Sequence, residues 1–198
     1  MENNITIFDP TEQYRNLLCD ASRDVGQVTD EQWKQLGGKV KNASPDNVSY
    51  ECKRTQMQKN LCQQFLQDNV YCKTTKLKVL TLTMEQQSRL PRGQKYIIRG
   101  PYRLTRGIVS LSKGQMAVLP LKGTADQNAR VTCYCSTTSP IGSRAIQDWK
   151  DAKPVLIPAG GCMRLEEGEV MFLVIQCLPK EEEEGSEAVG APQVAPPS

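Results

Sequence analysis

The sequence contains no histidine among its 198 residues. Histidine is the usual base that activates a serine or cysteine nucleophile and a common zinc ligand, so its absence excludes Ser-His-Asp and Cys-His catalysis and His-ligated metal sites. No run approaches the roughly 18 consecutive apolar residues of a membrane-spanning helix, and the first residues lack the basic and apolar regions of a secretory signal. We therefore expect no membrane span and a location in the cytoplasm, a reducing compartment, with a virion as the alternative.

The sequence also lacks the paired CxxC knuckles that hold structural zinc, although it contains eight cysteines. Disulfides are uncommon in reducing compartments, so we interpret the thiols as small buried apolar side chains. Glu166, Glu167 and Glu169 cluster around a turn, where they do not face one another as a general acid and base would. The sequence therefore predicts a protein that is not an enzyme and has no cofactor and no metal.

The fold class predicted is α+β, with three helices in the N-terminal region, residues 1–75. The segment Asp9–Glu12 starts with an aspartate N-cap followed by proline at the first helical position. The segment Thr29–Gln32 has the capping-box pattern that starts a second helix. A third helix, over about residues 50–72 with Ser49 as its cap, has a narrow apolar stripe and is expected to pack by one side only.

Residues 76–179 are expected to form an antiparallel β-sandwich. Eight short segments rich in β-forming residues are separated by glycine and proline turns, and eight is the strand count of a jelly roll. A hairpin is expected at Gly100-Pro101 and a short helix over residues 141–153. Val170–Ile175 (VMFLVI) is apolar on both faces, which predicts a central strand covered by the facing sheet and by a helix. The predicted strands are Lys76–Met84, Gln94–Arg99, Tyr102–Leu111, Gln115–Lys122, Ala129–Thr138, Pro154–Ile157, Cys162–Leu165 and Glu169–Leu178.

Residues 180–198 are expected to be a disordered acidic tail. Four consecutive glutamates are followed by proline, alanine, glycine and serine, a composition that buries too little apolar area to fold. The tail is interpreted as a solvated extension, and the alternative is that it competes with nucleic acid for the basic part of the chain.

Charge is distributed in three blocks along the chain. Residues 1–33 contain two basic and seven acidic side chains, residues 34–130 contain eighteen and five, and residues 131–198 contain five and ten. The blocks therefore carry −5, +13 and −5, which sum to the overall charge of +3. A strongly basic surface attracts polyanions, of which nucleic acid is the commonest. The alternative is that these cations simply keep the surface of the protein soluble.

The densest basic segment is residues 89–106, where six cations recur every few residues with two tyrosines among them and no acidic residue. Arginine and lysine bind phosphates, and tyrosine rings stack on unpaired bases. Three lysines just upstream would extend the site if the first strand lies nearby. If the tyrosines are core residues instead, the arginines are an ordinary polar edge. The candidate nucleic-acid-binding residues are Lys73, Lys76, Lys78, Arg89, Arg92, Lys95, Tyr96, Arg99, Tyr102, Arg103 and Arg106.

The function expected from these features is a nucleic-acid-binding structural protein that forms homo-oligomers. Binding would neutralise phosphates with little sequence specificity, and single-stranded RNA is the favoured partner. By analogy of architecture alone, a coat or movement-type protein of a virus fits. One alternative is a protein-interaction module, such as a chaperone or adaptor, that uses the β-sandwich and the acidic tail. A small-ligand pocket inside the sandwich is a third option.

Overall fold

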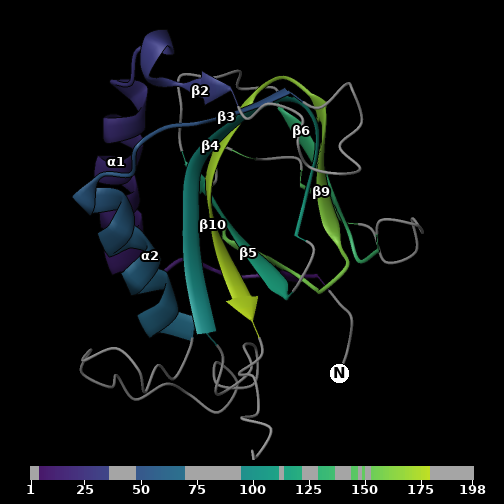
Figure 1. Ribbon diagram of the computed structural model, residues 1–198. Coiled ribbons are helices and arrows are strands. Elements are labelled where there is room, and N and C mark those ends of the chain that lie inside the picture. Colours follow the sequence, from purple (N-terminus) through teal and green to yellow (C-terminus); the bar gives the residue numbers. More distant parts are fainter. Residues whose placement is uncertain are drawn as a thin grey trace, which may run out of the picture.

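The structure is a computed structural model in which two α-helices lie against one large antiparallel sheet that curls into a half-barrel (Figure 1). This confirms the predicted α+β class, whereas the three helices and the jelly roll are not confirmed. No helix in the part of the chain that the structure describes is long and apolar enough to cross a membrane. The structure describes residues 5–35, 48–69, 95–111, 114–121, 129–136, 144–146, 149 and 153–178.

The first helix, α1 (Glu12–Gly26), begins two residues later than predicted. Its N-cap is Thr11, whose hydroxyl accepts a hydrogen bond of 3.2 Å from the amide N–H of Tyr14. Asp9 and Pro10 therefore lie before the helix, and the predicted aspartate cap is wrong. Threonine and aspartate both satisfy the free amides of a helix start, so the sequence pattern alone did not separate the two positions.

The predicted second helix is a single 3₁₀ turn, η1 (Asp30–Gln32). The predicted capping box is present, because the Thr29 backbone N–H donates to the side-chain oxygen of Gln32 over 2.9 Å. After this turn the chain enters a short strand, β2 (Lys34–Gln35), instead of continuing as a helix.

The predicted third helix starts later than expected, because its first residues form a strand. Val48–Glu51 is β3, so Ser49 is not a helix cap. The helix itself is α2 (Gln56–Asn69), which begins after Thr55. Here Thr55 and Gln58 form a reciprocal cap, with hydrogen bonds of 2.9 and 3.4 Å between each backbone N–H and the other side chain.

Each helix is fixed at both ends by the other. The Thr11 hydroxyl at the start of α1 donates a hydrogen bond of 2.6 Å to Asp68 near the end of α2. In the same way the Thr55 hydroxyl at the start of α2 donates a bond of 2.5 Å to Asp24 near the end of α1. The two N-cap threonines thus lock the helices into an antiparallel pair.

Two long strand paths carry the curl of the sheet. β4 (Lys95–Ser110) spans sixteen residues, and its N-terminal part pairs with β10 (Val170–Leu178) while its last four residues pair with β9 (Cys162–Glu167). β9 and β10 follow each other through Gly168, so together they run antiparallel to β4 along nearly its whole length. β5 (Gln115–Leu121) extends the sheet beyond β10, and β6 (Arg130–Tyr134) extends it beyond β9. The remaining strands of the sheet are β1 (Thr6–Ile7), β7 (Arg144–Ile146) and β8 (Val155–Ile157).

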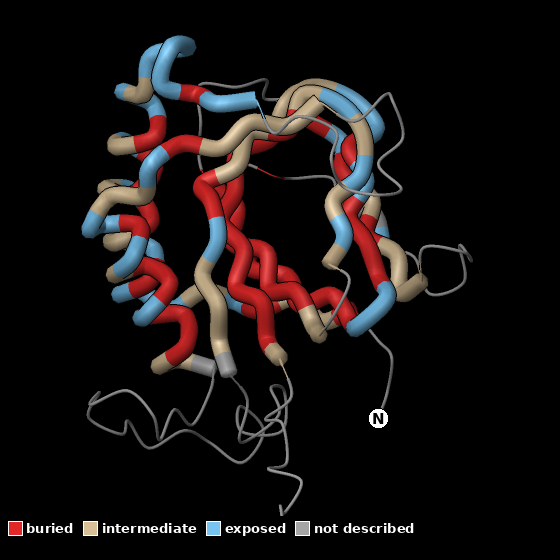
Figure 2. Tube along the Cα trace, in the orientation of Figure 1, coloured by how far each residue is buried: buried red, intermediate tan, exposed pale blue. Residues whose placement is uncertain are grey.

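β10 separates two hydrophobic cores, as Figure 2 shows by its nearly continuous burial. Val170, Phe172 and Val174 face the inside of the half-barrel, whereas the alternate residues face the helices. The outer core therefore contains the apolar sides of α1 and α2, and the inner core is filled by β5, β6, β8 and β9. This confirms the prediction that VMFLVI is a central strand covered on both faces.

Three further predictions, a hairpin, a short helix and a strand, need correction or fall outside the described residues. Gly100-Pro101 is not a hairpin, because β4 continues through it with only a shift in its register against β10. Within the segment predicted as a short helix over 141–153, Arg144–Ile146 forms the strand β7 and Trp149 lies in a 3₁₀ turn, while most of the other residues lie outside the described part of the chain. The predicted first strand, Lys76–Met84, lies outside the described residues.

Candidate nucleic-acid interface

The described part of the predicted basic segment lies on one strand, β4. It includes the side chains of Tyr96, Arg99, Tyr102, Arg103 and Arg106. The remaining candidates, Lys73, Lys76, Lys78, Arg89 and Arg92, lie outside the described residues, as does the side chain of Lys95.

Arg99 and Tyr102 lie together on the inner face of the curled sheet. Arg99 is in register with Val174, an inner-core residue, and its Nε donates a hydrogen bond of 3.0 Å to the side-chain oxygen of Gln176. The ring of Tyr102 packs against Phe172, with 5.7 Å between the ring centroids. The guanidinium of Arg99 is exposed, and within the described residues no carboxylate lies within ion-pair distance of it.

The pKa of Tyr102 reflects this mixed environment. Burial raises the pKa of its hydroxyl, and the carboxylate of Glu51 raises it further, while the charge and hydrogen bond of Arg99 act in the opposite direction. The hydroxyl is therefore neutral at physiological pH, and the half-buried ring keeps one part in contact with solvent. An arginine beside a partly exposed tyrosine is an arrangement that suits a phosphate and its adjoining base.

The bend at Gly100 is the reason that Arg99 and Tyr102 share a face. Residues three apart on a regular strand point to opposite faces, but here the register against β10 shifts by one residue. Gly100 has a φ of +85°, and a Cβ at this position would lie 2.9 Å from the backbone nitrogen of Tyr102. Its N–H donates to the carboxylate of Glu51 over 3.3 Å, so β3 holds the bend in place.

Arg103 lies on the opposite face and is already neutralised. Its guanidinium contacts Asp30 over 2.7 Å and Glu169 over 2.9 Å, and it lies 5.9 Å from the ring centre of Tyr50. Partial burial opposes the charged form, but the hydrogen bonds to Asp30 and Glu169 outweigh it and raise the pKa of Arg103. Arg103 therefore joins η1, β3 and the residue before β10 to β4, so its carboxylate contacts give it a structural role, and its predicted role in phosphate binding stays a prediction.

The other two described candidates, Tyr96 and Arg106, differ from each other in their burial. Tyr96 is half-buried and packs against the outer core beneath the helices. Arg106 is exposed and in register with Val48 of β3. The predicted single cationic strip is therefore not seen among the described residues, because its members lie on both faces of the sheet.

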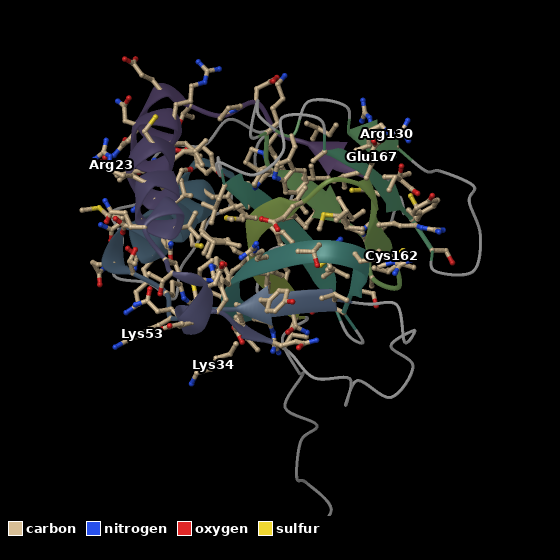
Figure 3. All side chains as sticks on the ribbon, turned by 90° about the horizontal axis from the view of Figure 1, so that it is seen from above. Arg23, Lys34, Lys53, Arg130, Cys162 and Glu167 are labelled. Atoms are coloured by element: carbon tan, nitrogen blue, oxygen red, sulfur yellow. The ribbon has the colours of Figure 1, made fainter. Side chains whose placement is uncertain are left out.

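Sequence reasoning missed several residues that shape this region. Glu51 fixes the bend and Gln176 orients Arg99, and the only sequence signal was a glutamine within an otherwise apolar strand. Lys34 and Lys53 are also exposed and point away from the body near β2 and β3 (Figure 3). They add cations that the segment 89–106 does not contain.

The described cysteines fit the interpretation as buried apolar side chains in most cases. Five of the seven are buried, and none of these seven forms a disulfide. Burial raises the pKa of the Cys62, Cys133 and Cys177 thiols to about 12. Among the described residues there is no group of three or more acidic or cysteine side chains placed to hold a metal ion.

Comparison of the chain with protein-family models, with curated proteins and with solved structures gives no match. The site geometry and the charge distribution are therefore the basis for the function proposed below.

Proposed function

We propose that the chain is a non-enzymatic nucleic-acid-binding structural protein that assembles with copies of itself. The observation that carries the proposal is the pair formed by Arg99 and Tyr102, an exposed arginine held beside a half-exposed tyrosine on one face of β4. The net charge of +13 over residues 34–130 supports it. A coat or movement-type role for such a protein stays a prediction.

Binding in this proposal is mostly electrostatic. Arg99 is exposed, and because Gln176 holds its Nε, the remaining N–H groups of the guanidinium can donate to a phosphate. The ring of Tyr102 then stacks on a neighbouring base, which favours single-stranded RNA because its bases are unpaired. We expect little sequence specificity, because phosphate contacts and stacking do not read base edges.

The test is a binding titration of the full chain with a fluorescently labelled single-stranded RNA between about 50 and 200 mM salt. The expected affinity falls steeply with salt, and Arg99→Ala reduces the slope of log K against log salt by about 0.7. Arg99→Lys keeps the charge and should keep the slope. Arg23→Ala is the matched control, because Arg23 is an exposed arginine of α1, which packs on the outer core, whereas Arg99 lies on the inner face of the sheet.

Absence of binding at the lowest salt, or affinity that does not change with salt, would overturn the proposal. Equal slopes for the wild-type chain and Arg99→Ala, with binding present, would remove Arg99 from the interface. Deletion of residues 180–198 distinguishes the proposed nucleic-acid binding from the adaptor alternative. An adaptor that uses the acidic tail loses its protein partner in this variant, whereas a nucleic-acid-binding protein keeps or gains affinity for RNA.

A further inference from the structure

One face of the sheet has no helix over it in the described part of the chain. The helices pack on β5, β10 and the N-terminal half of β4, and the outer core includes no residue of β6 or β9. We use the name open face for the outward side chains at the other end of the curl. The open face consists of Ile108, Arg130, Thr132, Tyr134, Arg164, Glu166 and Glu167.

Strand register places these side chains in direct contact range. Ile108 of β4 is opposite Arg164 of β9, which is in turn opposite Thr132 of β6. Their sequence neighbours Val131 and Met163 face the inner core, so this row points outward. Ile108 is 40% exposed and the side chain of Arg164 is 54% exposed, so the row is open to solvent.

The open face carries equal numbers of the two charges. Arg164 lies 3.6 Å from Glu166, and Arg130 lies 3.0 Å from Glu167. The Tyr134 hydroxyl donates a hydrogen bond of 3.3 Å to Glu166, so its ring belongs to the same surface. Figure 3 shows Arg130 and Glu167 next to each other, on a different side of the molecule from Arg23.

We infer that the open face binds a second copy of this chain. A two-fold axis places the same patch on both copies, so the patch must complement itself. A patch with two arginines and two glutamates does so, because each arginine of one copy can meet a glutamate of the other. Tyrosine and arginine are also enriched at protein interfaces, although glutamate is depleted there, so the argument rests on the charges and not on composition.

Nucleic acid fits this face less well than the Arg99 region. Glu166 and Glu167 neutralise both arginines, so phosphates approaching the open face would meet no net positive charge. The inference rests on the self-assembly included in the proposed function and does not depend on RNA binding.

The area of the open face predicts weak association. Three strands spaced about 4.8 Å apart, each with about five residues, give a patch of roughly 250 Å² per copy. Both copies together bury roughly 500 Å², which is below the roughly 1,200 Å² of stable complexes. The expected dimer therefore forms only at high protein concentration.

The test uses two charge reversals of the full chain, Arg164→Glu and Glu166→Arg, studied by sedimentation equilibrium without nucleic acid. The wild-type mass should rise from the 22.1 kDa monomer toward twice that value as concentration increases. Each reversed chain alone should associate at least about tenfold more weakly, because like charges then meet across the axis. An equimolar mixture of the two reversed chains should recover association, because opposite charges meet again.

The control is Arg23→Glu, which reverses an exposed, ion-paired arginine on α1 and should leave the association unchanged. Circular dichroism of every variant checks that the chain is folded. A wild-type mass that stays at the monomer value, or reversed chains that associate like the wild type, would overturn the inference. Loss of RNA binding by the reversed chains without any change in mass would assign the open face to nucleic acid and would also overturn it. If the wild-type chain associates as expected but does not bind RNA, only the proposed nucleic-acid role is overturned.

Discussion

Replacing Arg103 by alanine should destabilise the fold without weakening nucleic-acid binding. The exposed fraction of its side chain is 26%, and that of Glu169 is 21%, so their contact is largely shielded from water. A charged contact that is largely shielded from water contributes about 1.5–3 kcal/mol. Asp30 is 90% exposed, so its contact with Arg103 contributes about 0.5 kcal/mol. The contact with the ring of Tyr50 adds about 0.5–1 kcal/mol.

These contributions predict that Arg103→Ala lowers the free energy of unfolding by about 3 kcal/mol. Urea denaturation followed by circular dichroism measures this change. Glu169→Gln should cost more than Asp30→Asn, because only Glu169 is shielded from water. Arg103→Lys should recover part of the loss, since one ammonium cannot hold both carboxylates as the guanidinium does. The reasoning is refuted if Asp30→Asn costs as much as Glu169→Gln, or if Arg103→Ala costs less than about 1 kcal/mol.

Three further predictions concern stability. Thr55→Ala should cost about 1–2 kcal/mol in urea denaturation, because it removes both the cap of α2 and the bond to Asp24, whereas Thr55→Ser should cost much less. Gly114→Ala should cost about 2 kcal/mol more than Gly160→Ala, because both glycines have positive φ but only at position 114 would a Cβ lie 2.2 Å from a backbone oxygen; equal losses would contradict this. Cysteine thiols of the unfolded chain have a pKa near 8.5, whereas burial raises the pKa of three thiols of the folded chain to about 12. Stability should therefore be unaffected by these thiols below about pH 8.5 and should fall between about 8.5 and 12, by up to about 1.4 kcal/mol per pH unit for each thiol. Denaturation at pH 8 and 10 measures this loss, and unchanged stability at pH 10 would contradict it. The thiols concerned are Cys62, Cys133 and Cys177.

The sequence predicted the elements whose signal is local. The apolar run Val170–Ile175 predicted a strand covered on both faces, because no polar side chain interrupts it. The structure confirms this prediction. The prediction of a capping box at Thr29 is also confirmed. The length of the element that follows such a box depends on distant contacts, so the predicted helix became one turn and then strand β2.

The candidate site was less predictable, because it depends on pairing between strands far apart in the sequence. Gly100-Pro101 has the composition of a turn, but the neighbouring strand β10 runs past it and keeps β4 extended. That bend decides which face Arg99 and Tyr102 share, and Glu51, which fixes it, lies 49 residues away. Arg103 is chemically identical to Arg99 in the sequence, and only the folded positions of Asp30 and Glu169 separate their roles.

The place of β10 in the chain has a consequence for biosynthesis. It is the last described strand to leave the ribosome, yet its two neighbours, β4 and β5, precede it by about fifty residues or more. Until Val170–Leu178 emerges, both hydrophobic interiors lack their shared wall, and β4 and β5 expose the edges that β10 will cover. Folding is therefore expected to finish in a late step rather than grow gradually during translation, and the unfinished nascent chain is the form that most needs protection from aggregation.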